Sequence, residues 1–152
     1  LWEDLEEAKA LALKGMAQAD IVKLSEEELA FLVGSEDVVE ATAWMLGQYD
    51  QQAVFVTLGE KGCFYRTRNH FGTVGGFQVT AIDTTGAGDA FVGALLYQLL
   101  EVGESMPDIP QATLEDMVRF ANAAGALTTT RSGAIPAMPT LVEVKSFMKA
   151  TW

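Results

Sequence analysis

Basic residues are scarce in this sequence, and cysteine and histidine are almost absent. The 152 residues include 10 Lys+Arg against 21 Asp+Glu, a formal net charge of −11. Nucleic acids and anionic membrane surfaces are bound through basic patches, so binding to either is not expected. The single cysteine, Cys63, cannot form an internal disulfide, which favours a reducing cytoplasm. The single histidine, His70, leaves His-rich metal sites and most Ser-His-Asp triads without their parts.

Long apolar runs and abundant proline are also missing. No apolar run reaches the ~18 residues that a membrane-spanning helix needs. A hydrophobic content of 49% with only 4 Pro excludes a disordered chain. The length suits one globular domain with one sizeable core. The start at Leu1-Trp2 has neither the basic residues nor the apolar core of a signal peptide. It also lacks Met, which is expected of a piece of a longer protein or of a processed N-terminus.

Helical and strand patterns alternate along the chain. Residues 53–58 are apolar and rich in β-branched side chains, which is typical of a parallel strand buried on both faces. Ser25 and Glu28 have the spacing of a capping box, and Gly34 should end the helix that follows. The alternation predicts an α/β layered fold with a partly parallel sheet. The predicted helices cover about 4–17, 26–34, 38–49, 88–101, 113–130 and 141–149. The predicted strands cover 21–24, 53–58 and, as antiparallel edge strands, 63–66, 73–74 and 78–81.

A glycine-containing turn precedes the predicted helix at residue 88. The segment 83–89 reads Asp-Thr-Thr-Gly-Ala-Gly-Asp. Its glycines remove side chains where a helix begins, so unpaired N–H groups and the positive end of the helix dipole converge on one point. Such an anion hole suits a phosphate group. The Walker A and dinucleotide patterns are both incomplete, since Ala94-Leu95 follows Gly93 and the third glycine of a dinucleotide turn is missing.

Asp89 lies in the first turn of this helix. It could be an ordinary cap or a carboxylate stabilised by the dipole. A carboxylate in an anion hole would, however, repel a phosphate that is merely bound there. The arrangement makes sense if a phosphoryl group is transferred at this point and Asp89 takes a proton from the attacking hydroxyl.

Four segments resemble motifs of the PfkB/ribokinase family of sugar kinases, in the family's order. Segment 83–89 resembles the second family signature, and 19–29 the segment with the Asn-x-x-Glu motif. Residues 57–62 resemble the nucleotide-binding Thr-Leu-Gly-x-x-Gly loop, and 120–136 the closing adenine and cation segment. The resemblance implies a ribokinase-like (Rossmann-like) fold, a layered sheet with helices on both faces. Residues 1–152 would be its C-terminal, ATP-binding and catalytic-base portion, without the N-terminal sugar-binding half and lid.

The resemblance also implies roles for individual residues. Asp89 would be the catalytic base. The N–H groups that form the anion hole for the γ-phosphate would be those of Gly86, Ala87, Gly88 and Asp89. The residues expected to bind ATP are Ser25, Thr57, Gly59, Lys61, Gly62, Gly88 and Asn122, with Ser25 standing where the family has Asn. Glu28 would help to hold Mg²⁺ through water. The K⁺ site would comprise Asp83, Thr85, Thr128, Arg131 and Gly133.

Simpler interpretations stay open for several of these residues. Glu28 could be only the second half of the capping box. Lys61 could be a solvated turn residue, since glycine-flanked turns often expose lysine. Asn122, in a helix of small residues, could make a packing or interhelical hydrogen bond. His70 and Cys63 are interpreted as structural.

The implied activity is transfer of the ATP γ-phosphate to a sugar hydroxyl. Leu1-Trp2 and the turn at 23–28 most resemble the fructokinase branch of the family, which implies fructose as the sugar. Ribose, 2-keto-3-deoxygluconate and nucleosides are the alternative substrates. A homodimer of the full-length protein is expected, because the family often pairs through its lids. Two other classes stay open: a nucleotide-binding fragment that is inactive on its own, and a binding protein for another phosphate-containing ligand.

Overall fold

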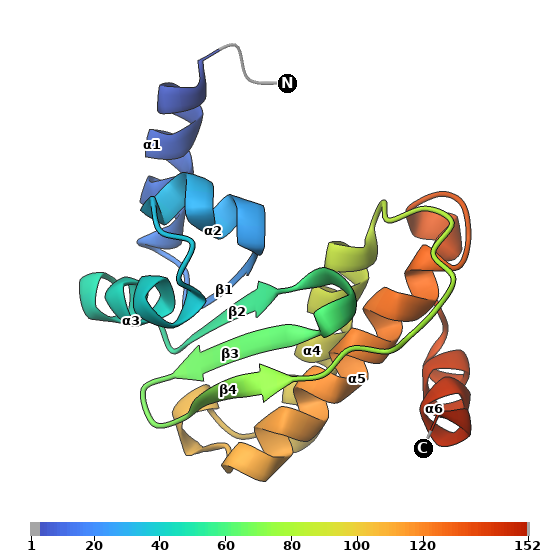
Figure 1. Ribbon diagram of the computed structural model, residues 1–152. Coiled ribbons are helices and arrows are strands. Elements are labelled where there is room, and N and C mark those ends of the chain that lie inside the picture. Colours follow the sequence, from blue (N-terminus) through green and yellow to red (C-terminus); the bar gives the residue numbers. More distant parts are fainter. Residues whose placement is uncertain (1–3, 152) are drawn as a thin grey trace. The chain divides into compact units, whose positions relative to one another are not determined.

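The computed structural model describes residues 4–151, which form two compact units (Figure 1). The first unit holds the chain up to Leu58 together with Phe64–Gly72, and the second holds Gly59–Cys63 and the chain from Thr73 onward. Each unit has a hydrophobic cluster of its own. The single domain expected from the sequence stays a prediction. Leu1-Trp2, which carries part of the fructokinase resemblance, lies outside the described residues.

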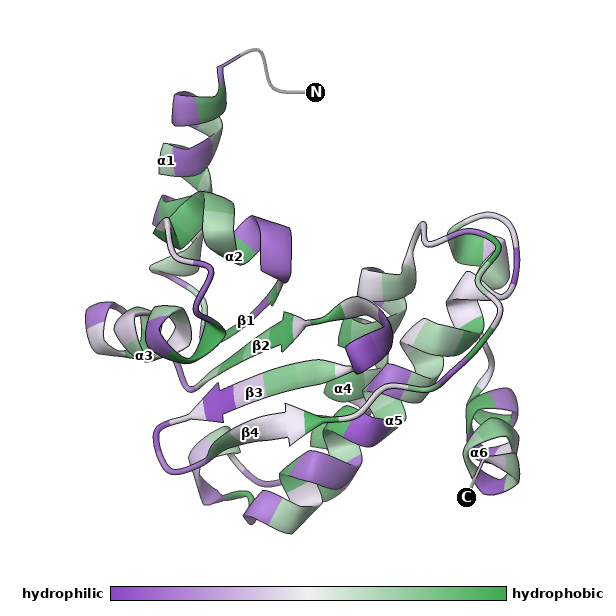
Figure 2. Ribbon diagram, in the orientation of Figure 1, coloured by the Kyte–Doolittle hydropathy of each residue, from purple (hydrophilic) through white to green (hydrophobic). Residues whose placement is uncertain are grey.

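The first unit is built on a parallel strand pair. Val22 stands opposite Val54 and Leu24 opposite Val56 in the register of β1 and β2. Residues Ala53–Val56 are fully buried, as the apolar run predicts, and β2 is hydrophobic over most of its length in Figure 2. The elements are α1 (Leu5–Met16), β1 (Ile21–Ser25), α2 (Glu26–Val33), α3 (Val38–Gln48) and β2 (Ala53–Thr57). The cluster comprises Met16, Val22, Leu24, Leu29, Leu32, Ala41, Met45, Val54, Val56 and Phe64.

Two further strands complete a sheet of order β1-β2-β3-β4. They are β3 (Cys63–Thr67) and β4 (Phe71–Val74). The arrows in Figure 1 show that β3 runs against β2 and that β4 runs against β3, so the prediction of antiparallel strands after Gly62 is confirmed. Thr67 N–H donates to the carbonyl of His70 at 2.8 Å and closes the hairpin. Cys63 is buried in β3, as its structural interpretation requires.

The second unit consists mainly of helices and the segments that join them, and it includes the last two residues of β4. Helices α4 and α5 pack along each other, and a Cβ added to Gly125 of α5 would lie 3.3 Å from the carbonyl oxygen of Ala87. Small side chains therefore allow this close approach. The elements are η1 (Gly59–Lys61), α4 (Ala87–Val102), η2 (Met106–Asp108), α5 (Gln111–Thr129), η3 (Ile135–Ala137) and α6 (Leu141–Ala150). Among residues 4–151, none of the helices combines the length and the apolar composition needed to span a membrane.

The strand predicted over 78–81 is wrong. The chain from Gly75 to Ala81 has no regular secondary structure and runs as a long connection between β4 and α4 in Figure 1. Its end is held by a helix, because the N–H groups of Ile82 and Asp83 both donate to the carbonyl of Thr129, at 2.7 and 3.1 Å. The residues that directly follow 78–81 are thus bonded to the end of α5 and not to a neighbouring strand.

Candidate functional site

Helix α4 begins on a glycine with no side chain to cap it. Gly86 has φ 81°, a left-handed conformation that is strained for other residues. A Cβ there would lie 3.0 Å from Cα of Ala134, which also leaves no room for a larger residue. As at any helix start, the N–H groups of Gly88 and Asp89 have no acceptor within the helix. They lie at the positive end of the dipole of α4. The N–H of Ala87, which was also predicted to form the anion hole, donates instead to the carbonyl of Thr84 at 3.2 Å and is not open to a phosphate.

Asp89 follows directly and is exposed to solvent. It lines a pocket of about 240 Å³ formed by α4, α5 and α6. Among the described residues that line this pocket, Asp89 is the only charged one, and the others are small, apolar or aromatic. The structure therefore places Asp89 in the first turn of α4 and at the wall of this pocket, and its role as a base stays a prediction.

The turn Gly59–Gly62 is packed backbone against backbone on the segment that follows β4. Gly62 has φ 102°, and a Cβ on it would lie 2.1 Å from the carbonyl oxygen of Val74. A Cβ on Gly76 would lie 2.4 Å from the carbonyl oxygen of Glu60. Gly76 N–H donates to the carbonyl of Lys61 at 3.2 Å. Only glycine fits at both contact points, so the shape of this predicted nucleotide-binding turn depends on residues 74–76.

Lys61 and Asn122 differ in their surroundings. The Lys61 side chain is exposed, which agrees with its interpretation as a solvated turn residue. Asn122 on α5 is 8% exposed, and its Nδ2 donates to the carbonyls of Val74 and Gly75, each at 3.1 Å. Both protons of the amide are used in these bonds, so only Oδ1 is left for a ligand. Contact of Asn122 with adenine stays a prediction.

Asp83 joins two of the segments predicted to surround K⁺. Its Oδ1 accepts the N–H of Thr85 and its Oδ2 accepts the N–H of Gly133, each at 2.9 Å. The Thr85 hydroxyl, followed by the N–H groups of Gly133 and Thr85, lowers the pKa of Asp83 to about 2. The carboxylate is therefore ionised at neutral pH. Thr128 is fully buried, and its carbonyl accepts the N–H of Arg131 at 3.3 Å. The structure thus brings together residues 83–85 and 128–133.

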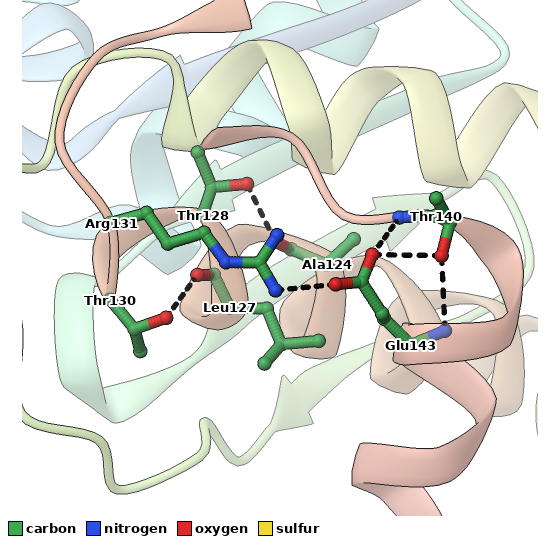
Figure 3. A network of polar contacts seen from close by, with 7 residues as sticks. All are labelled: Ala124, Leu127, Thr128, Thr130, Arg131, Thr140 and Glu143. Atoms are coloured by element: carbon green, nitrogen blue, oxygen red, sulfur yellow. Dashed lines mark hydrogen bonds and ion pairs between the residues drawn. The ribbon is translucent and has the colours of Figure 1, made fainter. Parts of the chain in front are cut away.

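The side chain of Arg131 extends to helix α6 (Figure 3). Its Nη2 lies 2.5 Å from Oε1 of Glu143, while Oε2 of Glu143 accepts the N–H and hydroxyl of Thr140 at 2.7 and 2.8 Å. The Thr140 N–H, then Arg131, then the Thr140 hydroxyl lower the pKa of Glu143 to about 2. Glu143 is not among the site residues predicted from the sequence. Thr140-Leu-Val-Glu143 nevertheless has the same capping-box spacing as Ser25–Glu28, which would have identified it.

Ser25, Glu28 and Thr57 belong to the first unit. Ser25 and Thr57 stand opposite each other at the carboxyl ends of β1 and β2, and ligands of α/β sheets bind at such ends. Ser25 Oγ accepts the N–H of Glu28 at 3.1 Å, and Oε2 of Glu28 accepts the N–H of Ser25 at 2.7 Å. The capping box is confirmed. Among the described residues, no three His, Cys, Asp or Glu side chains are grouped to hold a metal ion, so Glu28 would act as a single carboxylate.

Known proteins resemble this chain along nearly all of its length. Probable fructokinase-4 from Arabidopsis thaliana is 48% identical over 149 residues, which are 98% of this chain and 45% of the relative. Fructokinase from Xylella fastidiosa with bound ATP is 36% identical, with a TM-score of 0.87 over 99% of this chain and 48% of that structure. A fructokinase double mutant from Vibrio cholerae O395 with fructose, ADP and potassium ion is 42% identical, with a TM-score of 0.84 over 96% and 46%.

These similarities confirm the ribokinase-like α/β fold that the resemblance implies. The chain spans about half the length of the relatives just named. Residues 1–141 match the family described as "pfkB family carbohydrate kinase". With the glycine turn at the start of α4 and the packed Gly59–Gly62 turn in place, the chain belongs to the pfkB family of carbohydrate kinases.

Proposed function

We propose that the protein carrying this chain transfers the γ-phosphate of ATP to a hydroxyl group of fructose. The observation that carries the proposal is the start of α4, where Asp89 directly follows the uncapped turn Gly86-Ala87-Gly88. The choice of fructose is supported by the similarity to fructokinases from plants and bacteria. Ribose, 2-keto-3-deoxygluconate and nucleosides are the alternative substrates within the family.

The backbone N–H groups and the carboxylate at the start of α4 have different roles in this reaction. Phosphoryl transfer depends mainly on positioning and on stabilising the negative charge of the transferring group. The N–H groups of Gly88 and Asp89 can donate to its oxygens at the positive end of the helix dipole. As the sugar oxygen forms its bond to phosphorus and the bond to ADP breaks, the hydroxyl proton passes to the carboxylate of Asp89.

Two cations belong to the proposal, and the residues present fit them. Mg²⁺ and K⁺, when bound, supply positive charge near the phosphate groups and the anion hole. In the capping box Oε2 of Glu28 accepts the N–H of Ser25, so Oε1 is available to Mg²⁺. A single carboxylate is sufficient, because Mg²⁺ in proteins commonly binds one or two carboxylates and several waters. K⁺ is held by backbone carbonyls in other proteins, and the bonds of Asp83 to Gly133 and of Ile82 to Thr129 hold together the two segments that carry the predicted K⁺ ligands.

The variant Asp89→Asn tests the proposal. It keeps the shape of the side chain and removes the proton acceptor, so kcat should fall by about 10²–10⁴-fold while the Kd for ATP changes little. Asp116→Asn is the matched control, since Asp116 is an exposed acidic residue of the same unit that pairs with Arg119. Its kcat should equal that of the unmodified protein. Retained turnover in Asp89→Asn would exclude Asp89 as the base.

A second candidate function is a nucleotide-binding fragment without catalysis. It is favoured by the length of the chain, because the matched residues make up only 45% of the length of the plant fructokinase. Residues 1–152 would then be the ATP-binding portion of a single ribokinase-like domain whose sugar-binding half lies elsewhere. The chain alone should bind ATP but release no ADP when fructose is added. Fructose-dependent ADP release without an added partner would exclude this candidate.

The location and assembly of the protein complete the proposal. A cytoplasmic location is supported by a single, buried cysteine and is tested by cell fractionation. A homodimer of the full-length protein is supported only by the dimers that members of the family often form. Light scattering of the full-length protein tests it.

A further inference from the structure

Asn122 is a buried polar residue whose bonds reach far along the chain. It lies in the middle of α5 and is 8% exposed. Its amide nitrogen donates to the carbonyls of Val74 and Gly75, which precede it by 48 and 47 residues. Because both amide protons are bonded to backbone carbonyls, the side chain holds the end of β4 and the residue after it against α5. Breaking these bonds would leave two buried or half-buried carbonyls to find other donors.

The segment that Asn122 holds is in turn packed on the Gly59–Gly62 turn. Gly76 N–H donates to the carbonyl of Lys61, and the missing side chains of Gly62 and Gly76 allow the two backbones to meet. A Cβ on Gly62 would lie 2.5 Å from the nitrogen of Gly76, so no space separates the two segments. Since closely packed parts move together, a shift of residues 74–76 must displace the turn.

We propose that Asn122 is a positioning residue for ATP, which sets the backbone of the Gly59–Gly62 turn through residues 74–76. Its amide protons are committed to Val74 and Gly75, so its effect on ATP passes through the turn. This inference rests on the proposed function, in which the turn binds ATP. Asn122 then determines the affinity for ATP and leaves the proton transfer at Asp89 unaffected.

The variant Asn122→Asp tests the inference in the protein that carries this chain. The carboxylate has the same shape but cannot donate, and it faces two carbonyl oxygens. The Kd for ATP should rise about tenfold or more, with kcat at saturating ATP within about threefold. Amide hydrogen exchange should become faster at Gly76 and in the Gly59–Gly62 turn, which a residue that merely touched ATP would not cause. Asn122→Ser keeps one donor and should show a smaller rise in Kd, and it replaces Asn122→Asp if that variant does not fold.

Leu114→Val is the control for general loss of stability, because Leu114 is fully buried on the same helix about two turns away. Its Kd for ATP should be unchanged. An equal rise in Leu114→Val would overturn the inference, and so would a fall in kcat with unchanged Kd. Faster ATP dissociation with unchanged exchange at residues 59–62 and 74–76 would also overturn it, since Asn122 would then contact ATP itself. If the unmodified protein neither binds ATP nor turns over, the proposed function fails, whereas the exchange measurement still tests the link from Asn122 to the turn.

Discussion

Replacing Gly62 by alanine should be among the most destabilising single substitutions in the second unit. Two effects add. At φ 102° a residue with a Cβ is strained by about 1–3 kcal/mol. The new Cβ would also lie 2.1 Å from the carbonyl oxygen of Val74, so the backbones would have to part by about 1 Å to reach a normal C···O contact of about 3.3 Å. Such overpacking costs about 1–3 kcal/mol. The free energy of unfolding should therefore fall by about 2–6 kcal/mol in total.

Gly103→Ala is the matched control for this prediction. Gly103 also has a positive φ, 70°, but a Cβ there would meet nothing within 4 Å. Only the backbone strain of about 1–2 kcal/mol is expected. The free energy of unfolding of both variants is measured by urea unfolding followed by circular dichroism. Their midpoints can be compared if the slope of this free energy against urea concentration is the same in both variants. If Gly62→Ala proves as mild as Gly103→Ala, the close packing of the Gly59–Gly62 turn on Val74 is refuted.

Four further outcomes are expected. Ser25→Ala removes the capping oxygen of α2 and should cost about 1 kcal/mol in urea unfolding, whereas Ser25→Asn keeps a capping side chain and should cost less than half of that. Thr140→Ala should cost about the same at the start of α6, and no loss would show that its capping box contributes nothing. Asp83→Asn should speed amide exchange at Gly133 and raise the K⁺ concentration needed for activity, because Oδ2 of Asp83 accepts the N–H of Gly133. Unchanged exchange at Gly133 would show that Asp83 does not hold the segment around Gly133. Gln51→Met should lower the free energy of unfolding in urea by about 1–3 kcal/mol, because the buried Nε2 of Gln51 donates to the carbonyl of Met16 at 3.1 Å, and a gain in stability would show that the unpartnered Oε1 outweighs this bond.

Features that depend on neighbouring residues could be predicted from the sequence. The capping box of Ser25 and Glu28 is a matter of spacing, and the burial of β2 follows from an unbroken apolar run. The start of α4 just after Gly86 follows from the same kind of local pattern. The family resemblance rests on such local motifs too, and the match over residues 1–141 confirms it.

Features that depend on distant residues could not be predicted. A strand over 78–81 has a suitable local pattern, but the N–H groups just beyond it, on Ile82 and Asp83, bond to Thr129 at the end of α5. The division into two units likewise depends on contacts between segments far apart in the chain, which length and composition do not contain.

The sequence by itself determined the family, the order of the six α-helices and of the strands apart from the one predicted over 78–81, and the place of Asp89 at a helix start after glycines. Only the tertiary structure decided what Asn122 and Gly62 do. Val74 and Gly75 are remote from Asn122 in sequence and become its partners through packing, and the same packing brings Val74 and Gly76 against Gly62. The physical reason is that capping and burial patterns arise from neighbouring residues, whereas close backbone approach requires that distant segments have already met.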